Sequence, residues 1–299
     1  MNKILFFCDG GGLYGLGHVT RCLALAEELE ENGYIAKFVI NGSGVIPSFP
    51  YENYCKPELW PSKAAEYLCV VDSYAIKEED IYSLWCSAKS CLWLDDENRR
   101  AYPGGVVVNP SLYGNELGYN NPGVRHLLGV DYIILRRAFR QQPGKAVNEK
   151  VNELTIIMGG TDTKNLLPEI ADRLSVLVCK KNIISASSVS FQGYNMYSNL
   201  SAEEIAELFL QSDLVISAGG QTVNELIQMD TPAILIEAAK NQRININSAV
   251  KRGLAVTCMT DDIAGIVAEM DYGTREKLHT ALRKYDFSNG VNNIIRSCF

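Results

Sequence analysis

The chain has 299 residues, a formal net charge of −7 and a hydrophobic fraction of 47%, values typical of a folded globular protein. The acidic balance, without a face of clustered Lys and Arg, argues against a broad nucleic-acid-binding surface, and no apolar run reaches the roughly 18–20 residues that span a bilayer. The nine cysteines are scattered, odd in number and without a Cys-x-x-Cys pair, so we expect reduced thiols in a cytoplasmic protein rather than disulfides or a metal site.

Strand and helix patterns alternate through the first half of the chain. An apolar stripe with helical spacing predicts a helix over residues 20–31, after a short apolar strand. Turn-rich segments separate the elements that follow. The alternating order predicts a parallel, doubly wound sheet. The strands expected in this half are 4–7, 34–40, 67–72, 90–94, 106–109 and 131–135.

A polar stretch containing Pro143 and Gly144 then interrupts the pattern and predicts a linker over residues 141–153, between a domain at 1–140 and a domain at 154–299. The second half repeats the logic of the first. We therefore expect two doubly wound α/β domains with a ligand-binding cleft where the carboxyl ends of their sheets face each other. The expected elements are strands at 154–158, 183–189, 214–217 and 233–236 and helices at 165–177, 202–211, 222–229, 245–252 and 275–284.

The most informative motif is Gly15-Leu16-Gly17-His18, which lies between the first strand and the first helix. Backbone amides at the start of a helix are unpaired and favour anions. His18 is one of three histidines and lies in a setting that indicates chemistry; the alternative is that it caps its helix. Arg21, three residues later on the same helix face, either lies near a phosphate or forms a surface ion pair.

A second glycine turn, Ser217-Ala-Gly-Gly-Gln-Thr222, joins a strand to a helix in the other half. Glycines allow close backbone approach to a diphosphate, although a tight turn without a ligand is an equal alternative. Glu225 lies one turn into the helix, where an ionised carboxylate accepts hydrogen bonds from a vicinal diol. Met158-Gly-Gly-Thr-Asp162 is a similar turn. Neither a P-loop signature nor a dinucleotide fingerprint is present, so we expect neither a P-loop NTPase nor an NAD site.

The pair Asp95-Asp96 invites a metal interpretation, but adjacent residues on a strand point to opposite faces. We therefore expect a turn at the end of a strand, and we predict no metal and no cofactor. Tyr74 follows a buried strand and is equally consistent with packing and with ligand contact. Nothing promotes His126 or His279 to a functional role.

Taken in order, these motifs resemble the UDP-sugar hydrolases of the pseudaminic acid pathway, which remove UDP from UDP-2,4-diacetamido-2,4,6-trideoxy-β-L-altropyranose. That family is similar in fold to the GT-B glycosyltransferases, whose C-terminal half holds UDP. The spore-coat polysaccharide proteins of Bacillus-like bacteria are similar as well. The segments that carry the resemblance are 15–22, 71–74, 94–96, 109–110, 128–136, 159–162, 218–222 and 241–242.

The resemblance implies hydrolysis at the anomeric carbon without a metal, with UDP as the leaving group and His18 as the general base that activates water. A free imidazole has a pKa of about 6.5, so a neutral base persists at pH 7. The resemblance also implies a UDP-sugar as the binding partner, with the UDP held mainly by the second glycine turn. The residues implied to bind substrate are Gly15, Gly17, Arg21, Tyr74, Gly160, Thr161, Gly219, Gly220, Gln221, Thr222, Glu225, Asn241 and Gln242.

Two segments depart from the family. The first strand ends in Phe7-Cys8-Asp9-Gly10-Gly11 where the family usually has Arg-Ala-Asp/Ser, which leaves the identity of the sugar open. The helix at Thr222 begins Thr-Val-Asn-Glu instead of Thr-Trp-Glu, which shifts the expected UDP-binding acid by one residue. Two other classes also remain open: a GT-B glycosyltransferase that moves a sugar from UDP to an acceptor, and a non-catalytic nucleotide-sugar-binding protein. The oligomeric state stays open too.

Overall fold

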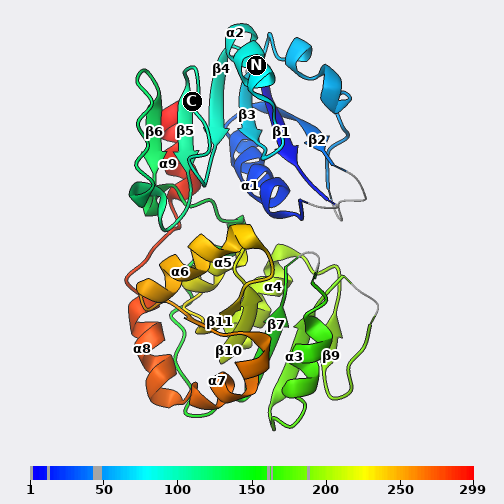
Figure 1. Ribbon diagram of the computed structural model, residues 1–299, viewed down its shortest axis with the longest axis vertical. Coiled ribbons are helices and arrows are strands. Elements are labelled where there is room, and N and C mark those ends of the chain that lie inside the picture. Colours follow the sequence, from blue (N-terminus) through cyan, green and yellow to red (C-terminus); the bar gives the residue numbers. More distant parts are fainter. Residues whose placement is uncertain (1–2, 12–13, 43–48, 160–161, 163, 187–188) are drawn as a thin grey trace. The chain divides into compact units, whose positions relative to one another are not determined.

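A computed structural model describes all residues except 1–2, 12–13, 43–48, 160–161, 163 and 187–188 (Figure 1). The chain divides into unit 1, which comprises Met1–Arg136 and Asn289–Phe299, and unit 2, which comprises Arg137–Ser288. Each unit contains one six-stranded sheet, and all neighbouring strands within each sheet are parallel. The predicted pair of doubly wound parallel sheets is therefore confirmed.

The sheet of unit 1 has the strand order β2-β1-β3-β4-β5-β6, which Figure 1 shows from right to left. Residues 4–9 of β1 are all buried, as expected for a parallel strand covered on both faces. The elements of this unit are β1 (Lys3–Asp9), α1 (Gly17–Glu31), β2 (Ile35–Asn41), β3 (Leu68–Asp72), α2 (Glu78–Ser87), β4 (Ser90–Leu94), β5 (Val106–Asn109), β6 (Arg125–Leu128) and α9 (Gly290–Cys298).

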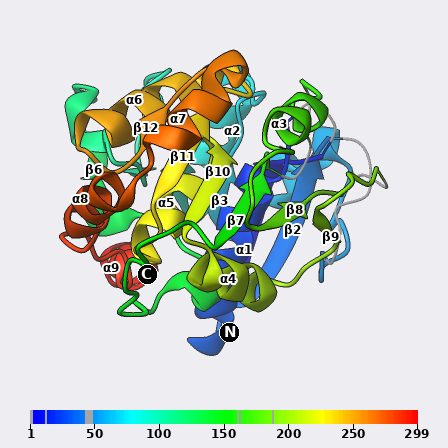
Figure 2. The ribbon, with the colours of Figure 1, turned by 90° about the horizontal axis from the view of Figure 1, so that it is seen from below.

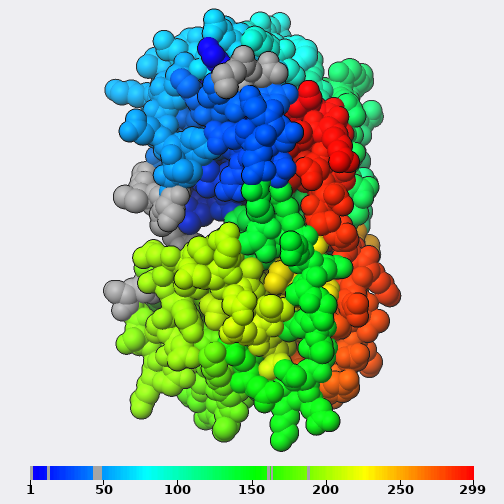
Figure 3. Space-filling model, turned by 180° about the vertical axis from the view of Figure 1, so that it is seen from behind, coloured from blue at the N-terminus to red at the C-terminus, as the bar shows by residue number. Residues whose placement is uncertain are grey.

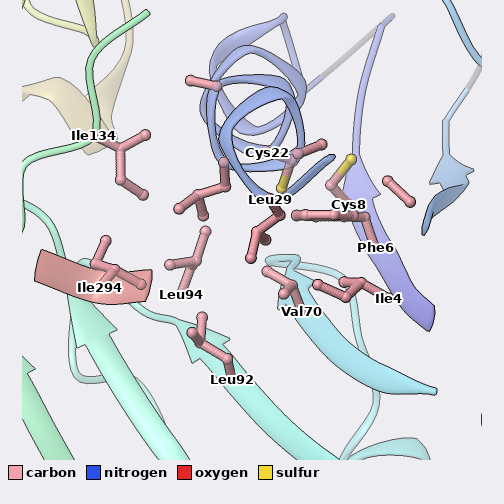
Figure 4. Close-up of a cluster of buried hydrophobic side chains, with 14 of the residues drawn as sticks. Ile4, Phe6, Cys8, Cys22, Leu29, Val70, Leu92, Leu94, Ile134 and Ile294 are labelled. Atoms are coloured by element: carbon pink, nitrogen blue, oxygen red, sulfur yellow. The ribbon is translucent and has the colours of Figure 1, made fainter. Parts of the chain in front are cut away.

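Helix α1 packs its apolar stripe onto this sheet. Figure 4 shows Phe6 and Cys8 of β1 close to Cys22 and Leu29 of α1 in one buried cluster. The cluster fixes the angle at which α1 leaves the first strand, and so it determines where the first turn of the helix lies. All nine cysteines of the chain carry free thiols.

The sheet of unit 2 has the order β12-β11-β10-β7-β8-β9. Helices α3 and α7 lie on one side of it and α4 lies on the other (Figure 2). The elements are β7 (Glu153–Ile157), α3 (Leu167–Arg173), β8 (Lys180–Ile184), β9 (Asn195–Tyr197), α4 (Ala202–Gln211), β10 (Leu214–Ala218), α5 (Thr222–Gln228), β11 (Ala233–Ile236), α6 (Arg243–Lys251), β12 (Val256–Thr257), α7 (Ile263–Glu269) and α8 (Tyr272–Leu282).

The C-terminal helix α9 belongs to unit 1, although the sequence-based division assigns residues 154–299 to one domain. Val291 and Ile294 are buried in the same cluster as the apolar face of α1, and Figure 3 shows α9 in red against α1 in blue. A Cβ atom on Gly290 would come within 1.9 Å of the carbonyl oxygen of Ile133, so the helix begins in close contact with the backbone of unit 1. An amphipathic stripe fits either sheet, so the sequence pattern alone does not select this one.

Three other local predictions differ from the structure. The strand expected at 131–135 is a short 3-10 turn followed by buried extended chain, and the sixth strand of unit 1 is Arg125–Leu128 instead. The segment expected to be a linker, 141–153, lies within unit 2. Lys145 holds part of it by donating to the carbonyl groups of Phe209 and Ser212, and burial lowers the pKa of this lysine to about 8. Strand β8 covers 180–184 rather than 183–189.

In the described part of the chain, no helix is both long and apolar enough to cross a membrane.

Truncation of Ile294 to alanine tests the assignment of α9 to unit 1. Because this side chain is 0% exposed, Ile294→Ala should lower the free energy of unfolding by about 2–5 kcal/mol, measured in urea. Arg296→Ala, on the exposed face of α9, should change it by less than about 0.5 kcal/mol. Hydrogen exchange in α1 should accelerate in the first variant. Unchanged protection of α1 would contradict the assignment.

Candidate functional site

Polar residues mark the carboxyl ends of five adjacent strands in unit 1. Strands β2, β1, β3 and β5 end in Asn41, Asp9, Asp72 and Asn109, and Asp95 directly follows β4. Chain order reverses at β1, which has β2 on one side and β3 on the other. Open α/β sheets bind ligands at such a reversal, beyond the carboxyl ends of the strands. This edge is where the sequence places His18.

His18 and Asp72 form a buried pair at this reversal. His18 lies in the first turn of α1, and its Nδ1 lies 2.7 Å from Oδ1 of Asp72. Burial raises the pKa of Asp72, but the charges and hydrogen bonds of Arg21 and His18 outweigh that effect and lower the pKa below its usual range. Nη2 of Arg21 lies farther from Nδ1, at 3.2 Å. An ionised carboxylate only accepts hydrogen bonds, so we assign the proton of the imidazole to Nδ1.

The opposite ring nitrogen, Nε2 of His18, has no hydrogen-bond partner among the described residues. In this tautomer Nε2 carries a lone pair, so it can accept a proton from water. The imidazole is bound through Nδ1 to Asp72, and no side chain caps α1. His18 therefore does not serve as a helix cap.

Arg21 connects the ends of two strands from within α1. Its Nε and Nη2 donate to Asp72 at 2.5 and 2.6 Å, and its Nη1 donates to Asp96 at 2.9 Å. Burial lowers the pKa of this guanidinium, but the two carboxylates have the larger effect. The pKa therefore lies above its usual value, and the group stays charged. The side chain is 8% exposed, so this is a buried bridge and not a surface ion pair. The expected phosphate contact of Arg21 stays a prediction, and three of its five N–H groups donate to carboxylates.

Tyr74 completes the cluster. Its hydroxyl donates to Oδ1 of Asp96 at 2.9 Å, and its ring meets the His18 ring edge to face, with 4.5 Å between centroids. The guanidinium carbon of Arg99 lies 3.7 Å from the centroid of the Tyr74 ring. Burial, with the charge of Asp96, raises the pKa of the Tyr74 phenol well above its usual value. Tyr74 therefore contacts the imidazole directly.

The two adjacent aspartates lie just after β4 and face different partners. Asp96 faces Arg21 and Tyr74, whereas Asp95 accepts from the backbone N–H of Glu97 at 3.1 Å and the hydroxyl of Tyr102 at 3.2 Å. No group of three or more metal-ligating side chains occurs in the described residues. The sequence analysis missed Asp72 and Asp96 as site residues. The signal was available, because both are acidic residues at the ends of apolar strands.

In unit 2 the chain order reverses between β10 and β7, so the turns after these strands lie at the equivalent position. A Cβ atom on Gly219 would lie 2.3 Å from Cγ1 of Ile246, so close packing of α6 requires glycine there. Gly220 has open space, since its nearest neighbour would be Nε2 of Gln242 at 3.8 Å. Asn245, which the sequence analysis did not single out, donates to both glycine carbonyls at 2.9 and 3.2 Å.

The remaining predicted site residues of unit 2 differ in exposure. Gln221 and Thr222 are half-buried at the start of α5, and Glu225 is 2% exposed. Asn241 is exposed. Gln242 turns its Oε1 toward its own loop, where it accepts from the backbone N–H groups of residues 238 and 239. Gly160 and Thr161 lie outside the described residues. In unit 1, Gly15 has φ +69°, a conformation that favours glycine, and Gly17 is the first residue of α1.

The fold, with the glycine turns before α1 and α5, defines the structural class of the protein. MurG from Acinetobacter baumannii matches with a TM-score of 0.65 and 13% identity, and the match covers 100% of this chain and 99% of that one. At this identity the likeness concerns the fold alone. The protein has a two-domain GT-B fold built from Rossmann-like units. No family model matches the sequence.

Curated relatives narrow the comparison. The chain is 26% identical over 277 residues to the UDP-2,4-diacetamido-2,4,6-trideoxy-β-L-altropyranose hydrolase of Campylobacter jejuni, which covers 85% of this chain and 98% of the relative. It is 24% identical to the spore coat polysaccharide biosynthesis protein SpsG of Bacillus subtilis, over 84% of this chain and 81% of the relative. These two matches confirm the resemblance that the motifs predict.

A third relative belongs to a different class. The chain is 29% identical over 353 residues to the UDP-N-acetylglucosamine–N-acetylmuramyl-(pentapeptide) pyrophosphoryl-undecaprenol N-acetylglucosamine transferase of Clostridium perfringens. This match covers 99% of the chain and 98% of the relative. Similarity therefore extends both to a hydrolase and to a transferase.

The buried ion pair predicts a specific response to acid. Because the pKa of Asp72 is lowered by folding, the unfolded state binds more protons in acid, and stability from this group rises with pH there. Its contribution is complete above the unfolded pKa of about 3.9 and is lost as pH falls toward the lower folded value. Asp72→Asn should cost about 3–5 kcal/mol at pH 7, because the buried Arg21 loses one of its two carboxylate partners and two of its charged hydrogen bonds.

Urea unfolding from pH 2 to 7 tests this expectation. The difference between the wild type and Asp72→Asn should shrink below about pH 4, where the unfolded aspartate binds a proton. Asp131→Asn, which changes an exposed carboxyl group of the same unit, should have little effect at any pH. A difference that stays constant with pH would show that Asp72 is not held ionised by its partners.

The two adjacent glycines of unit 2 should respond differently to alanine. Gly219→Ala forces its Cβ atom into Ile246 and should lower the free energy of unfolding by about 1–3 kcal/mol. Gly220→Ala has room and serves as the matched control, with an expected change below about 0.5 kcal/mol. Equal losses in thermal or urea unfolding would contradict the packing reason for Gly219.

Proposed function

We propose that this protein hydrolyses a UDP-linked acetamido-deoxysugar at the anomeric carbon and releases UDP and the free sugar. The His18–Asp72 pair is the observation that carries the proposal, because it presents an unprotonated Nε2 at the ligand-binding edge of a GT-B domain. The similarity to the Campylobacter jejuni hydrolase supports the reaction class. The product would enter the biosynthesis of pseudaminic-type nonulosonic acids or of surface polysaccharides.

In the proposed mechanism, Nε2 of His18 takes a proton from a water molecule while the water oxygen attacks the anomeric carbon. The bond between that carbon and the diphosphate oxygen breaks, and its electron pair leaves with UDP. Asp72 stabilises the imidazolium that forms, because its carboxylate accepts from Nδ1 at 2.7 Å. General-base catalysis of this kind contributes about 10²–10⁴-fold to the rate. The imidazolium then returns its proton to solvent.

Arg21 acts on this reaction through Asp72. Its two hydrogen bonds to Asp72 orient this carboxylate and keep it ionised, so the tautomer of His18 is fixed before substrate binds, and a third hydrogen bond ties Arg21 to Asp96. We therefore assign Arg21 to positioning and not to the phosphate contact expected from the sequence. Tyr74, against the imidazole, is the residue of this cluster that we assign to the sugar.

We assign the UDP to the glycine turn of unit 2. Gly220 leaves room for close approach, and the half-buried Gln221 and Thr222 follow it at the start of α5. Donors of this type stabilise a leaving diphosphate without a metal. Glu225 is nearly fully buried, so we do not include it among the ribose contacts. A cytoplasmic location is part of the proposal, because all nine cysteines are free thiols and disulfides persist mainly in oxidising compartments.

A GT-B transferase is the second candidate, and the 29% identity to the Clostridium perfringens transferase favours it. The same Nε2 would then deprotonate an acceptor hydroxyl group instead of water. A non-catalytic binding protein has no need of the buried carboxylates that orient His18, so the geometry disfavours that class.

A panel of UDP-sugars incubated with the protein and without an acceptor tests the proposal. UDP release should occur for at least one UDP-acetamido-deoxysugar. His18→Asn should reduce kcat by about 10²–10⁴-fold, and Asp72→Asn should reduce it by at least about 10-fold. His126→Asn, a second histidine of unit 1 outside the site, is the matched control and should retain the wild-type rate.

Two results would contradict the hydrolase. If UDP appears only when an acceptor glycan or lipid is added, the transferase is correct. If His18→Asn releases UDP at the wild-type rate, the general base lies elsewhere, even where the reaction class holds.

A further inference from the structure

Asp9, the last residue of β1, is a buried carboxylate that the mechanism above does not use. Asp9 is 0% exposed. It matches the Asp of the pattern Arg-Ala-Asp/Ser of the related hydrolases, whereas Phe7 and Cys8 before it depart from that pattern. It pairs with no Lys, Arg or His within the described residues.

Four neutral donors surround this carboxylate. Oδ1 accepts from Nδ2 of Asn41 at 2.7 Å and from the hydroxyl of Ser73 at 2.8 Å. Oδ2 accepts from the backbone N–H groups of Tyr74 at 2.6 Å and Ala75 at 3.1 Å. A carboxylate has about four lone-pair sites, so its acceptor capacity is filled.

Three of these four bonds fix the turn that follows β3. Ser73 strengthens the same turn, because its hydroxyl oxygen also accepts from the N–H groups of Ala75 at 3.2 Å and Ile76 at 2.9 Å. Tyr74 projects from this turn, with its ring against His18 and its hydroxyl on Asp96. The placement of the Tyr74 ring therefore depends on backbone bonds that end at Asp9.

We propose that Asp9 is a positioning residue of the site: it holds the turn 73–75 in place and thereby sets the Tyr74 ring against the catalytic imidazole. The kinetic consequence of this inference rests on the proposed hydrolytic function, whereas the structural role of Asp9 does not. A displacement of about 1 Å at a catalytic group can lower the rate by up to about 10²-fold, so loss of the carboxylate should lower kcat.

Unit 2 contains a matched control. Asp213 is also a buried aspartate next to a strand, and it accepts from Nδ2 of Asn148 and from two consecutive backbone N–H groups, those of residues 152 and 153. Removing either carboxylate leaves similar donors unsatisfied, so both losses should lower stability. The Asp9 carboxylate holds a turn that contacts His18, whereas the Asp213 carboxylate holds the chain before β7.

The experiment compares Asp9→Ala with Asp213→Ala by NMR of protein labelled with ¹⁵N-histidine. The chain has three histidines, so three imidazole spin systems appear, and His18→Asn identifies one of them. The Tyr74 ring shifts the imidazole protons of His18 through its ring current. In Asp9→Ala these His18 resonances should move, and in Asp213→Ala they should stay in place. Neither spectrum requires a substrate.

Kinetics provide the second readout once a UDP-sugar substrate is known. Asp9→Ala should lower kcat by about 10–100-fold and raise KM, because Tyr74 is also assigned to the sugar, whereas Asp213→Ala should retain both within about threefold. Unmoved His18 resonances in a folded Asp9→Ala protein would overturn the proposal. Moved resonances without any UDP hydrolysis by the wild type would support the positioning role and count against the proposed function alone.

Asp9→Asn keeps the test decisive if the alanine variant does not fold. The remaining carbonyl oxygen can accept from the N–H groups of residues 74 and 75, and the new amide can face Asn41 after that side chain rotates. We expect His18 resonances close to the wild type and at least about one third of its kcat. Ser73→Ala, which removes the hydroxyl from the same turn, should move the resonances in the direction seen for Asp9→Ala. The opposite pattern in these two variants would overturn the proposal.

Discussion

The buried guanidinium of Arg21 is the interaction on which the site of unit 1 depends. It joins a carboxylate at the end of β3 to one just beyond β4, so it sets the spacing of two strand ends from a third element, α1. It also offsets the cost of burying Asp72, whose ionised form then fixes the proton of His18 on Nδ1. A lysine has a single point charge and lacks the planar fork that reaches both carboxylates together.

In both units the reversal of chain order brings the candidate site groups to one edge of the sheet, but these groups differ in their chemistry. In unit 1 the reversal at β1 brings together acidic side chains and a histidine. In unit 2 the reversal between β7 and β10 brings together backbone turns with glycines. A histidine held by a carboxylate suits proton transfer, and backbone N–H groups at the start of a helix suit a diphosphate. This division agrees with the assignment of the base to unit 1 and of UDP to unit 2.

The sequence predicts those parts of the fold that depend on local pattern. The strands 90–94 and 106–109 and the helix 202–211 have the predicted bounds, because their apolar spacing is clear and turn residues flank them. The prediction of a strand at the apolar run 131–135 is wrong. The hydrophobicity of this run reflects burial and not pairing with a neighbouring strand. Helix α9 returns to unit 1 through contacts with residues more than 100 positions away, which no local pattern encodes.

The site was predictable in the same partial way. His18 stands out by its position directly after Gly15-Leu16-Gly17, and the resemblance implies that Tyr74 binds substrate. Asp72 and Asp96 become recognisable as site residues through their hydrogen bonds to Arg21, which lies 51 and 75 positions away in sequence. For Gly219, packing against Ile246 is sufficient to require glycine, and the ligand contact stays a prediction.

The carboxylates at the edge of unit 1 differ in the donors that they accept from, and this difference supports the proposed role of His18 as the proton acceptor. Asp9 accepts from neutral donors, Asp72 from Arg21 and His18, and Asp96 from Arg21 and Tyr74. Each of these acids has hydrogen-bond donors in place, and the pKa values of Asp72 and Asp96 are lowered, which makes both poor bases near neutral pH. Nε2 of His18 is the position in this cluster, within the described part of unit 1, that no donor reaches. In the proposed mechanism, the acids therefore determine which atom takes the proton without taking it themselves.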